Sequence, residues 1–207
     1  MDFNQAGVYP PKQLHTADFL VRPLRATDVD LDYAAVMERP AMLRLSGGGV
    51  WPADDFTREA NLADLIVHEK EHEDGVAFTF TVMNPDQSRC LGCIYVNQLA
   101  KAHRLSRSAE AAPDAVGDKI AIVRYWVRQS QVDDDLDWRL LSALMRWFAE
   151  DWQLDGAYFR AHARDRRQQH LMSRAGLPLA YTLEVPGRQG PFLAFGPADL
   201  PNNEGEG

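Results

Sequence analysis

The sequence predicts one α/β domain, in which a central mixed, twisted sheet of about seven strands is flanked by about four helices. The chain has 207 residues, of which 45% are hydrophobic and 25% charged, as in globular proteins large enough to bury a core. Segments with strand-like alternation interleave with segments of helical spacing along the chain. The strongest predicted strand, residues 119–128, is followed by the strongest predicted helix, residues 136–152.

The first elements follow a polar leading segment. Residues 1–16 are expected to form an N-terminal arm that lies over the domain or is disordered, ahead of a domain spanning residues 17–196. Residues 18–25 alternate well enough for a strand. The Ala-Thr-Asp that follows caps a predicted helix over residues 28–39.

A glycine-rich stretch, residues 46–51, predicts a flexible connection. A phosphate-cradling loop is the alternative, but no suitable strand leads into it and no Gly-Lys-Ser/Thr follows. Asp54 or Asp55 is then expected to cap a helix that ends near His72.

The middle of the chain predicts a hairpin and a long loop. Residues 76–83 alternate as a strand, and residues 90–96 return as its partner after a turn. Residues 98–117 show little periodicity and predict a mobile loop of the length typical of functional lids.

The remaining elements complete the sheet. In the predicted helix 136–152 the apolar residues fall on one face. A short strand, a helix and a closing pair of strands follow it, and a disordered acidic tail ends the chain. Their ranges are 157–161, 165–174, 181–185 with 191–195, and 197–207.

The net charge of the chain bears on which kinds of partner it can bind. The chain has 22 Lys and Arg against 30 Asp and Glu, a formal net charge of −8. Binding to phosphate backbones needs a basic face, so nucleic acid is not expected as a partner. No apolar run approaches a membrane span and the N-terminus lacks the pattern of a signal peptide, so we expect a cytoplasmic protein without membrane contact.

The two cysteines, Cys90 and Cys93, form a CxxC pair within a predicted strand. A redox or zinc role would need a helix N-terminus or a second pair of ligands nearby, and neither accompanies them. We therefore expect two buried thiols.

His68, Glu69 and His72 match the HExxH pattern, in which two histidines on one helical face bind zinc. The charged surroundings and the end of the helix just beyond favour a solvated helix terminus instead. We expect no metal.

Several strings resemble the GNAT acetyltransferase superfamily, in family order over residues 18–195. They are FLVRPLRATDVD, the hairpin, IVRYWVR, LLSALMRWFAEDW and HLMSRAGL. The resemblance implies an acetyl-CoA or other acyl-CoA donor, whose pantetheine pairs with the strand 119–128 and whose pyrophosphate rests on the start of the next helix. The cofactor-binding residues it implies are Trp126, Val127, Arg128, Leu136, Asp137 and Trp138.

The sequence departs from the family pattern at the phosphate loop, Q/R-x-x-G-x-G/A in the family. Val132 stands at the first position, and Asp135 and Asp137 replace the glycines. Carboxylates there repel an anionic donor, or simply cap the helix. The side chains of Arg128, Arg139, Arg166 and Arg167 are candidates to reach the phosphates from the sides.

The residues that would handle protons also differ. Met172 stands where many family members have a tyrosine that protonates the leaving thiolate, and Asp165 stands where Asn is usual. The candidate catalytic residues are therefore His162 and Tyr125, near the expected separation of two strands. A lone histidine at a strand end is more often simply solvated.

Two functions follow. The first is an N-acyltransferase that moves an acetyl or acyl group from acyl-CoA to an amine of a small molecule or peptide, with the thioester polarised by a backbone N–H near Val127. The alternative is a noncatalytic binding or regulatory module that has lost the usual pyrophosphate site. A homodimer is left open.

Overall fold

The computed structural model describes residues 2–104, 117–185 and 187–197. A single mixed sheet has the order β1-β2-β3-β4-β5-β6-β8-β7, and within it only β5 and β6 pair in parallel. The strands are β1 Leu14–His15, β2 Leu20–Pro23, β3 Phe78–Met83, β4 Cys90–Gln98, β5 Ile120–Val127, β6 Gly156–His162, β7 Leu179–Leu183 and β8 Phe192–Phe195. The helices are α1 Val29–Val36, α2 Pro40–Ser46, α3 Arg58–Glu73, α4 Leu99–Arg104, α5 Leu136–Glu150 and α6 Arg166–Arg174, with 3-10 turns η1 Ala26–Asp28 and η3 Gln129–Gln131.

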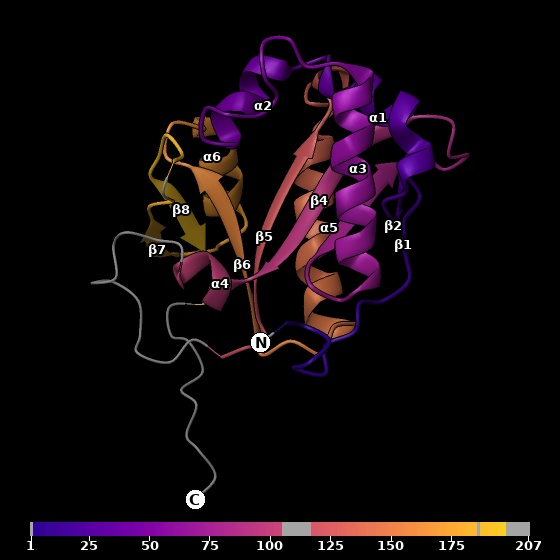
Figure 1. Ribbon diagram of the computed structural model, residues 1–207. Coiled ribbons are helices and arrows are strands. Elements are labelled where there is room, and N and C mark those ends of the chain that lie inside the picture. The colour runs from indigo at the N-terminus through magenta and orange to yellow at the C-terminus, as the bar shows by residue number, and fades with distance from the viewer. Residues whose placement is uncertain (1, 105–116, 186, 198–207) are drawn as a thin grey trace, which may run out of the picture.

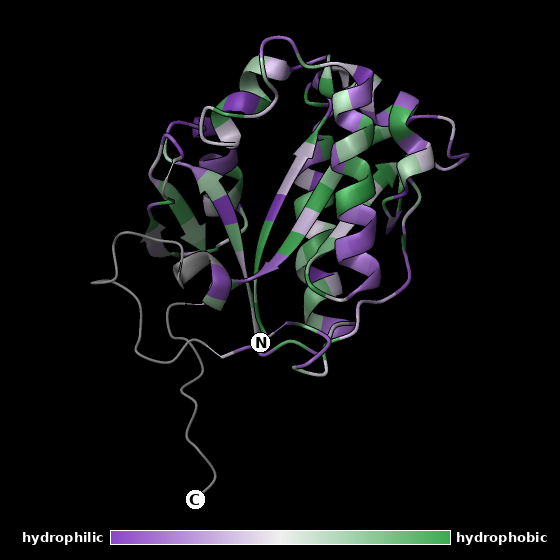
Figure 2. Ribbon diagram, in the orientation of Figure 1, coloured by the Kyte–Doolittle hydropathy of each residue, from purple (hydrophilic) through white to green (hydrophobic). Residues whose placement is uncertain are grey.

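The predicted α/β class is confirmed, with eight strands in place of about seven and six α-helices in place of about four in the described residues. Figure 1 shows α1 and α3 on one face of the sheet and α5 on the other. The apolar stripe of α5 packs on β3, β4 and β5 in the larger core, and Figure 2 shows green, apolar stretches in the strands between the two helical layers. A second core joins α1 and α3 to the opposite face of the sheet.

The parallel pair of β5 and β6 is short. Its register runs from Ile120 opposite Gly156 to Val123 opposite Phe159, and beyond that pair the two strands form no further ladder. Figure 1 shows them diverging toward α2, which spans the open end. β5 instead continues along β4, where a Cβ on Gly92 would lie 2.1 Å from the carbonyl oxygen of Trp126. Glycine at this position therefore permits the close approach of the two strands.

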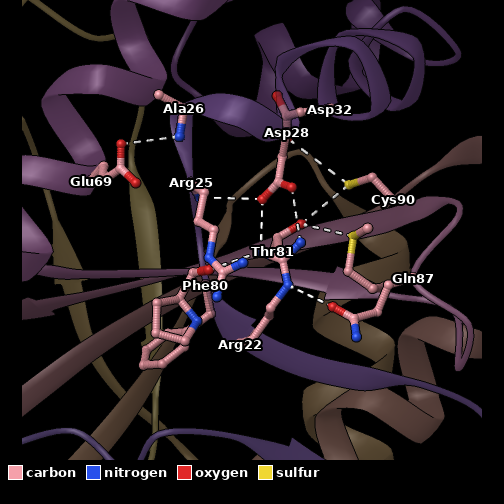
Figure 3. A network of polar contacts seen from close by, with 12 residues as sticks. Arg22, Arg25, Ala26, Asp28, Asp32, Glu69, Phe80, Thr81, Gln87 and Cys90 are labelled. Carbon is pink, nitrogen blue, oxygen red and sulfur yellow. Dashed lines mark hydrogen bonds and ion pairs between the residues drawn. The ribbon is translucent and has the colours of Figure 1, made fainter.

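A buried polar network fixes the entry into α1 (Figure 3). Arg22 on β2 forms a bidentate ion pair with Asp28 at 2.7 and 2.9 Å, and Asp28 also accepts from the backbone N–H of Arg25 at 3.2 Å. Gln87 accepts from Nε of Arg22 at 3.0 Å. Because every group has a partner, the charges are held in the core without an unpaired atom among them.

Several predicted boundaries are corrected by the structure. α2 was not predicted at all. The cap of α3 is Thr57, which accepts from the N–H of Ala60, rather than Asp54 or Asp55. Residues 99–104, within the predicted loop 98–117, form α4, and Gln98 still belongs to β4; residues 105–116 and the predicted tail from 198 onward lie outside the described residues.

The predicted N-terminal arm packs against the domain. Phe3 and Val8 have no exposed surface, and the ring of Phe3 stacks on Phe78 with centroids 5.1 Å apart. The arm also contributes the short edge strand β1. In the described ranges no helix is long and apolar enough to cross a membrane.

Candidate active site

The gap between β5 and β6 begins after Val123 and Phe159. Alternate β5 residues beyond that point direct their backbone groups away from β4 and toward the gap. The carbonyl of Tyr125 accepts from Nε2 of Gln168 at 2.8 Å, and the carbonyl of Val127 accepts from Nη1 of Arg39 at 3.0 Å. Side chains from α6 and from the start of α2 thus bond the β5 carbonyls that β6 leaves open.

These side chains nearly fill the gap. The cavity that remains is about 20 Å³ and is lined by residues of α2, β5, α5 and α6. Gln168 is in place because Asp165 caps α6, accepting from the Gln168 N–H at 3.0 Å. Burial lowers the pKa of Arg39, and its Nε has no hydrogen-bond partner. Arg39 is therefore held by a single carbonyl in a costly environment.

Tyr125 lies on the α5 side of the gap and lines the same cavity. Its hydroxyl is buried and has no hydrogen-bond partner. Burial, together with the nearby carboxylates of Asp137 and Asp165, raises the pKa of Tyr125 far above its usual value. The hydroxyl stays protonated and is a free donor inside the candidate site.

The start of α5 keeps an unusual backbone. Asp135 adopts a left-handed conformation with φ 55° and ψ 28°, a geometry that favours glycine, at a position where the loop pattern of the family that the sequence resembles has glycine. The local backbone that would present amides to an anion therefore survives the substitution. What differs is the side chain placed on it.

An acidic side chain already satisfies that helix start. Asp137 is 6% exposed and accepts from the N–H of Trp138 at 3.0 Å. Arg167 from α6 binds Asp137 through Nε at 2.5 Å and Nη2 at 2.9 Å, reaches Asp135 at 3.1 Å, and donates to the carbonyl of Val132 at 2.9 Å. The carboxylates of Asp135 and Asp137 thus balance both the positive end of the α5 dipole and the charge of Arg167, with no external anion.

Two of the other arginines considered for phosphates, Arg128 and Arg139, have partners of their own. Arg128 is 7% exposed, and its guanidinium pairs with Glu38 and donates to the carbonyl of Cys90 at 2.9 Å. That contact lowers the pKa of Glu38 to about 2. Arg139 pairs with Asp18 at 3.2 Å on the surface. Arg139 also donates through Nη1 to the carbonyl of Asp134 at 2.7 Å, so both Arg139 and Arg167 contact the loop before α5, and Arg167 is the one that binds its carboxylates.

The remaining residues implied by the resemblance do not all reach the gap. Leu136 is buried in the core under α5, Trp126 is buried on the opposite face of the sheet, and the ring of Trp138 lies 3.9 Å from the Arg174 guanidinium. The side chain of Met172 is fully buried in the core and has no proton to donate. Of the predicted site residues, Tyr125, Trp126, Val127 and Asp137 line the small cavity at the gap, and Leu136 and Trp138 do not.

His162 ends β6 and is 3% exposed. Its Nε2 lies 2.9 Å from the carbonyl of Gln189, and its Nδ1 accepts from the N–H of Arg164 at 3.1 Å. The ring packs edge-on against Phe192 with centroids 5.3 Å apart. Both ring nitrogens are therefore bonded to backbone in this conformation, with the proton on Nε2.

The two motifs that suggested other chemistry serve the fold. Cys90 and Cys93 are buried on β4, as expected, and burial raises the pKa of Cys90 to about 12. His72 lies 2.9 Å through Nδ1 from the carbonyl of Thr79 and packs on Phe80. Within the described ranges no three His, Cys, Asp or Glu side chains gather as a metal site.

The sequence interpretation missed Arg39, Gln168 and two strand arginines, Arg124 and Arg160. The strand arginines line a second cavity of about 410 Å³ beside the gap. A charged residue inside an otherwise apolar strand such as IVRYWVR was the available signal, because an arginine in a central strand needs a specific environment.

The comparisons with known proteins agree with this geometry. A family model described as the acetyltransferase (GNAT) domain matches residues 18–178. The chain belongs to the GNAT acetyltransferase family. A comparison with curated protein sequences gives no match.

Solved structures of GNAT enzymes share the fold. The chain is similar to RimL, a ribosomal L7/L12 α-N-protein acetyltransferase in complex with coenzyme A, with a TM-score of 0.68 at 16% identity over 91% of this chain and 100% of that one. It is similar to a ribosomal-protein-S5-alanine acetyltransferase from Vibrio fischeri, with a TM-score of 0.64 at 13% identity over 93% and 100%. A third is the microcin C7 self-immunity acetyltransferase MccE with acetyl-CoA and AMP, with a TM-score of 0.65 at 10% identity over 88% and 93%.

Proposed function

We propose that this GNAT domain is an N-acyltransferase that takes its acyl group from acyl-CoA in the gap between β5 and β6 and transfers it to an amine. The observation that carries the proposal is the pair of β5 carbonyls, at Tyr125 and Val127, that β6 leaves free and side chains alone occupy. An extended amide chain such as pantetheine pairs with groups of this spacing. Two of the similar enzymes named above, RimL and MccE, carry coenzyme A and acetyl-CoA, which supports the same donor here.

The free backbone groups of β5 can pair with the donor, but the side chains of Gln168 and Arg39 now occupy them. Gln168 and Arg39 lie at the edges of the gap, on α6 and at the start of α2, so a rotamer change of each frees the strand without moving the fold. At the far end, Arg167 would have to exchange Asp135 or Asp137 for a phosphate. The aspartates that replace the glycines of the family loop thus compete with the phosphate of the donor for the guanidinium of Arg167.

The residues of the chain have defined roles in such a reaction. The bound thioester supplies an activated acyl group, and the N–H of Val127, on the same edge of β5 as its carbonyl, is placed to polarise it. The buried hydroxyl of Tyr125 donates a hydrogen bond to the developing thiolate. Because its pKa is raised, the hydroxyl stabilises that charge and keeps its own proton. Attack by the neutral amine forms the amide N–C bond and breaks the C–S bond, and the proton that the amine releases goes to the departing thiolate. His162 takes a proton only after its bonds to Gln189 or Arg164 open.

One observation favours the alternative of a noncatalytic module. The ion pairs of Arg167 and the bonds of Gln168 and Arg39 give the gap an internally satisfied state that needs no ligand. A regulatory domain would hold that state permanently. An enzyme would open it when the donor arrives, and the affinity for the donor separates the two.

The deciding experiment is calorimetry with acetyl-CoA and desulfo-CoA on the whole chain. The proposal predicts binding of both ligands by wild type, and a several-fold tighter interaction with Gln168→Ala, since the carbonyl of Tyr125 then lacks its internal partner. The loss of one neutral hydrogen bond is about 1 kcal/mol, which corresponds to roughly fivefold in affinity.

Gln169→Ala is the matched control. Gln169 is the next residue on α6, and its Nε2 donates to the carbonyls of His162 and Ala163, away from the gap. Its replacement should leave donor affinity unchanged. If folded wild type and folded Gln168→Ala both give no heat with millimolar ligand, the acyltransferase proposal fails and the noncatalytic module replaces it.

A further inference from the structure

The second cavity, of about 410 Å³, lies where β5 and β6 separate, and three arginines line it. Arg124 and Arg160 each directly follow the last paired residues, Val123 and Phe159, so they form the first unpaired step of the two strands. Arg188 joins them from the segment between β7 and β8. Tyr125 points into the core under α5, and the alternation of β5 therefore places Arg124 on the other face of the sheet.

The guanidinium groups are oriented by aromatic rings and a carbonyl. Arg124 lies 4.1 Å from the centroid of Tyr95, and Arg160 lies 4.3 Å from the centroid of Phe192. Arg188 donates through Nη1 to the carbonyl of Gly47 at 3.2 Å. Cation–π attraction holds a guanidinium over the face of a ring without using its N–H groups, which can still donate to a ligand.

The three positive charges lack a carboxylate counterion in the described part of the chain, where no ion pair includes any of them. Glu71 also lines the cavity, but its Oε2 lies 3.3 Å from Nδ1 of His68. Burial, with the charges of Arg124 and Arg188, lowers the pKa of Arg160 to about 9. A chain with net charge −8 thus concentrates uncompensated positive charge in one concave site.

We propose that this cavity binds a small molecule through an oxyanion group, a phosphate or a carboxylate, and that under the proposed acyltransferase function this molecule is the acceptor amine. Guanidinium groups bind both oxyanions in bidentate fashion, and the cavity has the volume of a small-ligand site. Arg124 and Tyr125 are consecutive on β5, so an amine anchored by its anionic end lies next to the gap expected to hold the donor.

The test measures binding by calorimetry in low-salt buffer, first without any acyl-CoA. The probes are O-phosphoethanolamine and β-alanine, two amines with a phosphate and a carboxylate, and ethanolamine, which has neither. We expect at least one anionic probe to bind and ethanolamine not to bind. The stronger of the two anionic probes identifies whether phosphate or carboxylate is preferred.

Two variants test the arginines, and one is the control. Arg160→Met keeps an apolar side chain against Phe192 and removes one of three like charges, so it should raise the melting temperature. It should also weaken the binding of the anionic probe by roughly tenfold or more. A variant that merely damaged the fold would lower the melting temperature. Arg124→Gln should weaken the binding of the same probe. The control is Arg58→Gln: Arg58 pairs with Asp30 at the surface, so its replacement should leave the binding of the probe unchanged.

The inference is overturned if the anionic probes bind wild type no better than ethanolamine, or if they bind Arg160→Met and Arg124→Gln as tightly as wild type. Its failure is distinguishable from that of the proposed function. Anion binding that depends on Arg160 without any acyl transfer supports the anion site and contradicts the enzyme. Acyl transfer to ethanolamine and to the anionic probes with equal kcat/KM supports the enzyme and overturns the anion site.

Discussion

At the scale of single residues, Asp32 gives the protein a specific dependence on pH. It is 4% exposed between α1 and α3, where Nδ2 of Asn61 donates to it at 2.9 Å. Burial raises the pKa of its carboxyl from 3.8 to about 6. Below about pH 4 the carboxyl is protonated in both the folded and the unfolded chain, and its stabilising contribution is fully present. That contribution is lost as pH rises through about 6.

Asp32→Asn should therefore flatten the decrease in the free energy of unfolding between pH 4.5 and 7.5. The shift of about 2 pKa units corresponds to about 3 kcal/mol as an upper value. Urea denaturation at both pH values measures the effect. Glu38→Gln is the control, because the pKa of Glu38 is lowered to about 2 and its contribution changes only below about pH 4.5. An unchanged slope in a folded Asp32→Asn protein would contradict the assignment.

At the scale of elements, the ion pair of Arg22 and Asp28 ties β2 to the turn that starts α1. Asp28→Ala leaves the buried guanidinium without its carboxylate, and we expect a loss of about 3–5 kcal/mol in the free energy of unfolding. Asp30→Ala removes an exposed partner of Arg58, and the loss should be much smaller because water screens this pair. Denaturant titration of the two variants compares them. Equal losses would show that burial does not govern the value of these pairs.

The first turn of α5 offers a second test at this scale. Asp135→Gly fits the left-handed backbone, and Asp137→Gly releases Arg167 from its main partner. The double variant should bind CoA more tightly than wild type, by tenfold or more, because the freed guanidinium and helix dipole then face a phosphate. Calorimetry measures the affinity. Unchanged or weaker binding by a folded double variant would place the pyrophosphate elsewhere.

At the scale of the whole molecule, the first residues belong to the packed domain. Phe3 is fully buried against Phe78, and Asn4 bonds the end of α3 through Asp74 and Gly75. Phe3→Ala should lower the free energy of unfolding by about 3–5 kcal/mol, the cost of deleting a buried aromatic ring. Thermal or urea unfolding measures it, with Tyr9→Ala as the control because Tyr9 is 67% exposed. A negligible loss would show that the segment detaches readily.

Sequence patterning was informative where burial is regular. The alternation of β3, β4 and β5 and the apolar stripe of α5 placed those elements within a few residues. α2 was missed because it spans only seven residues, Pro40–Ser46, and shows no extended periodicity. The contacts of the candidate site were less accessible. Arg39 and Gln168 reach β5 from remote positions, and the meeting of Arg124 with Arg160 depends on the register of two distant strands.

The carbonyls of Tyr125 and Val127 give the molecule a built-in means to set its own ligand affinity. Gln168 and Arg39 act as tethered competitors whose effective concentration is fixed by the fold. Any ligand that pairs with this edge of β5 must displace them, so its apparent dissociation constant is the intrinsic one divided by the fraction of open protein. Substitutions on α6, outside the strand that touches the ligand, can thus retune binding over a wide range while the ligand's own contacts stay the same.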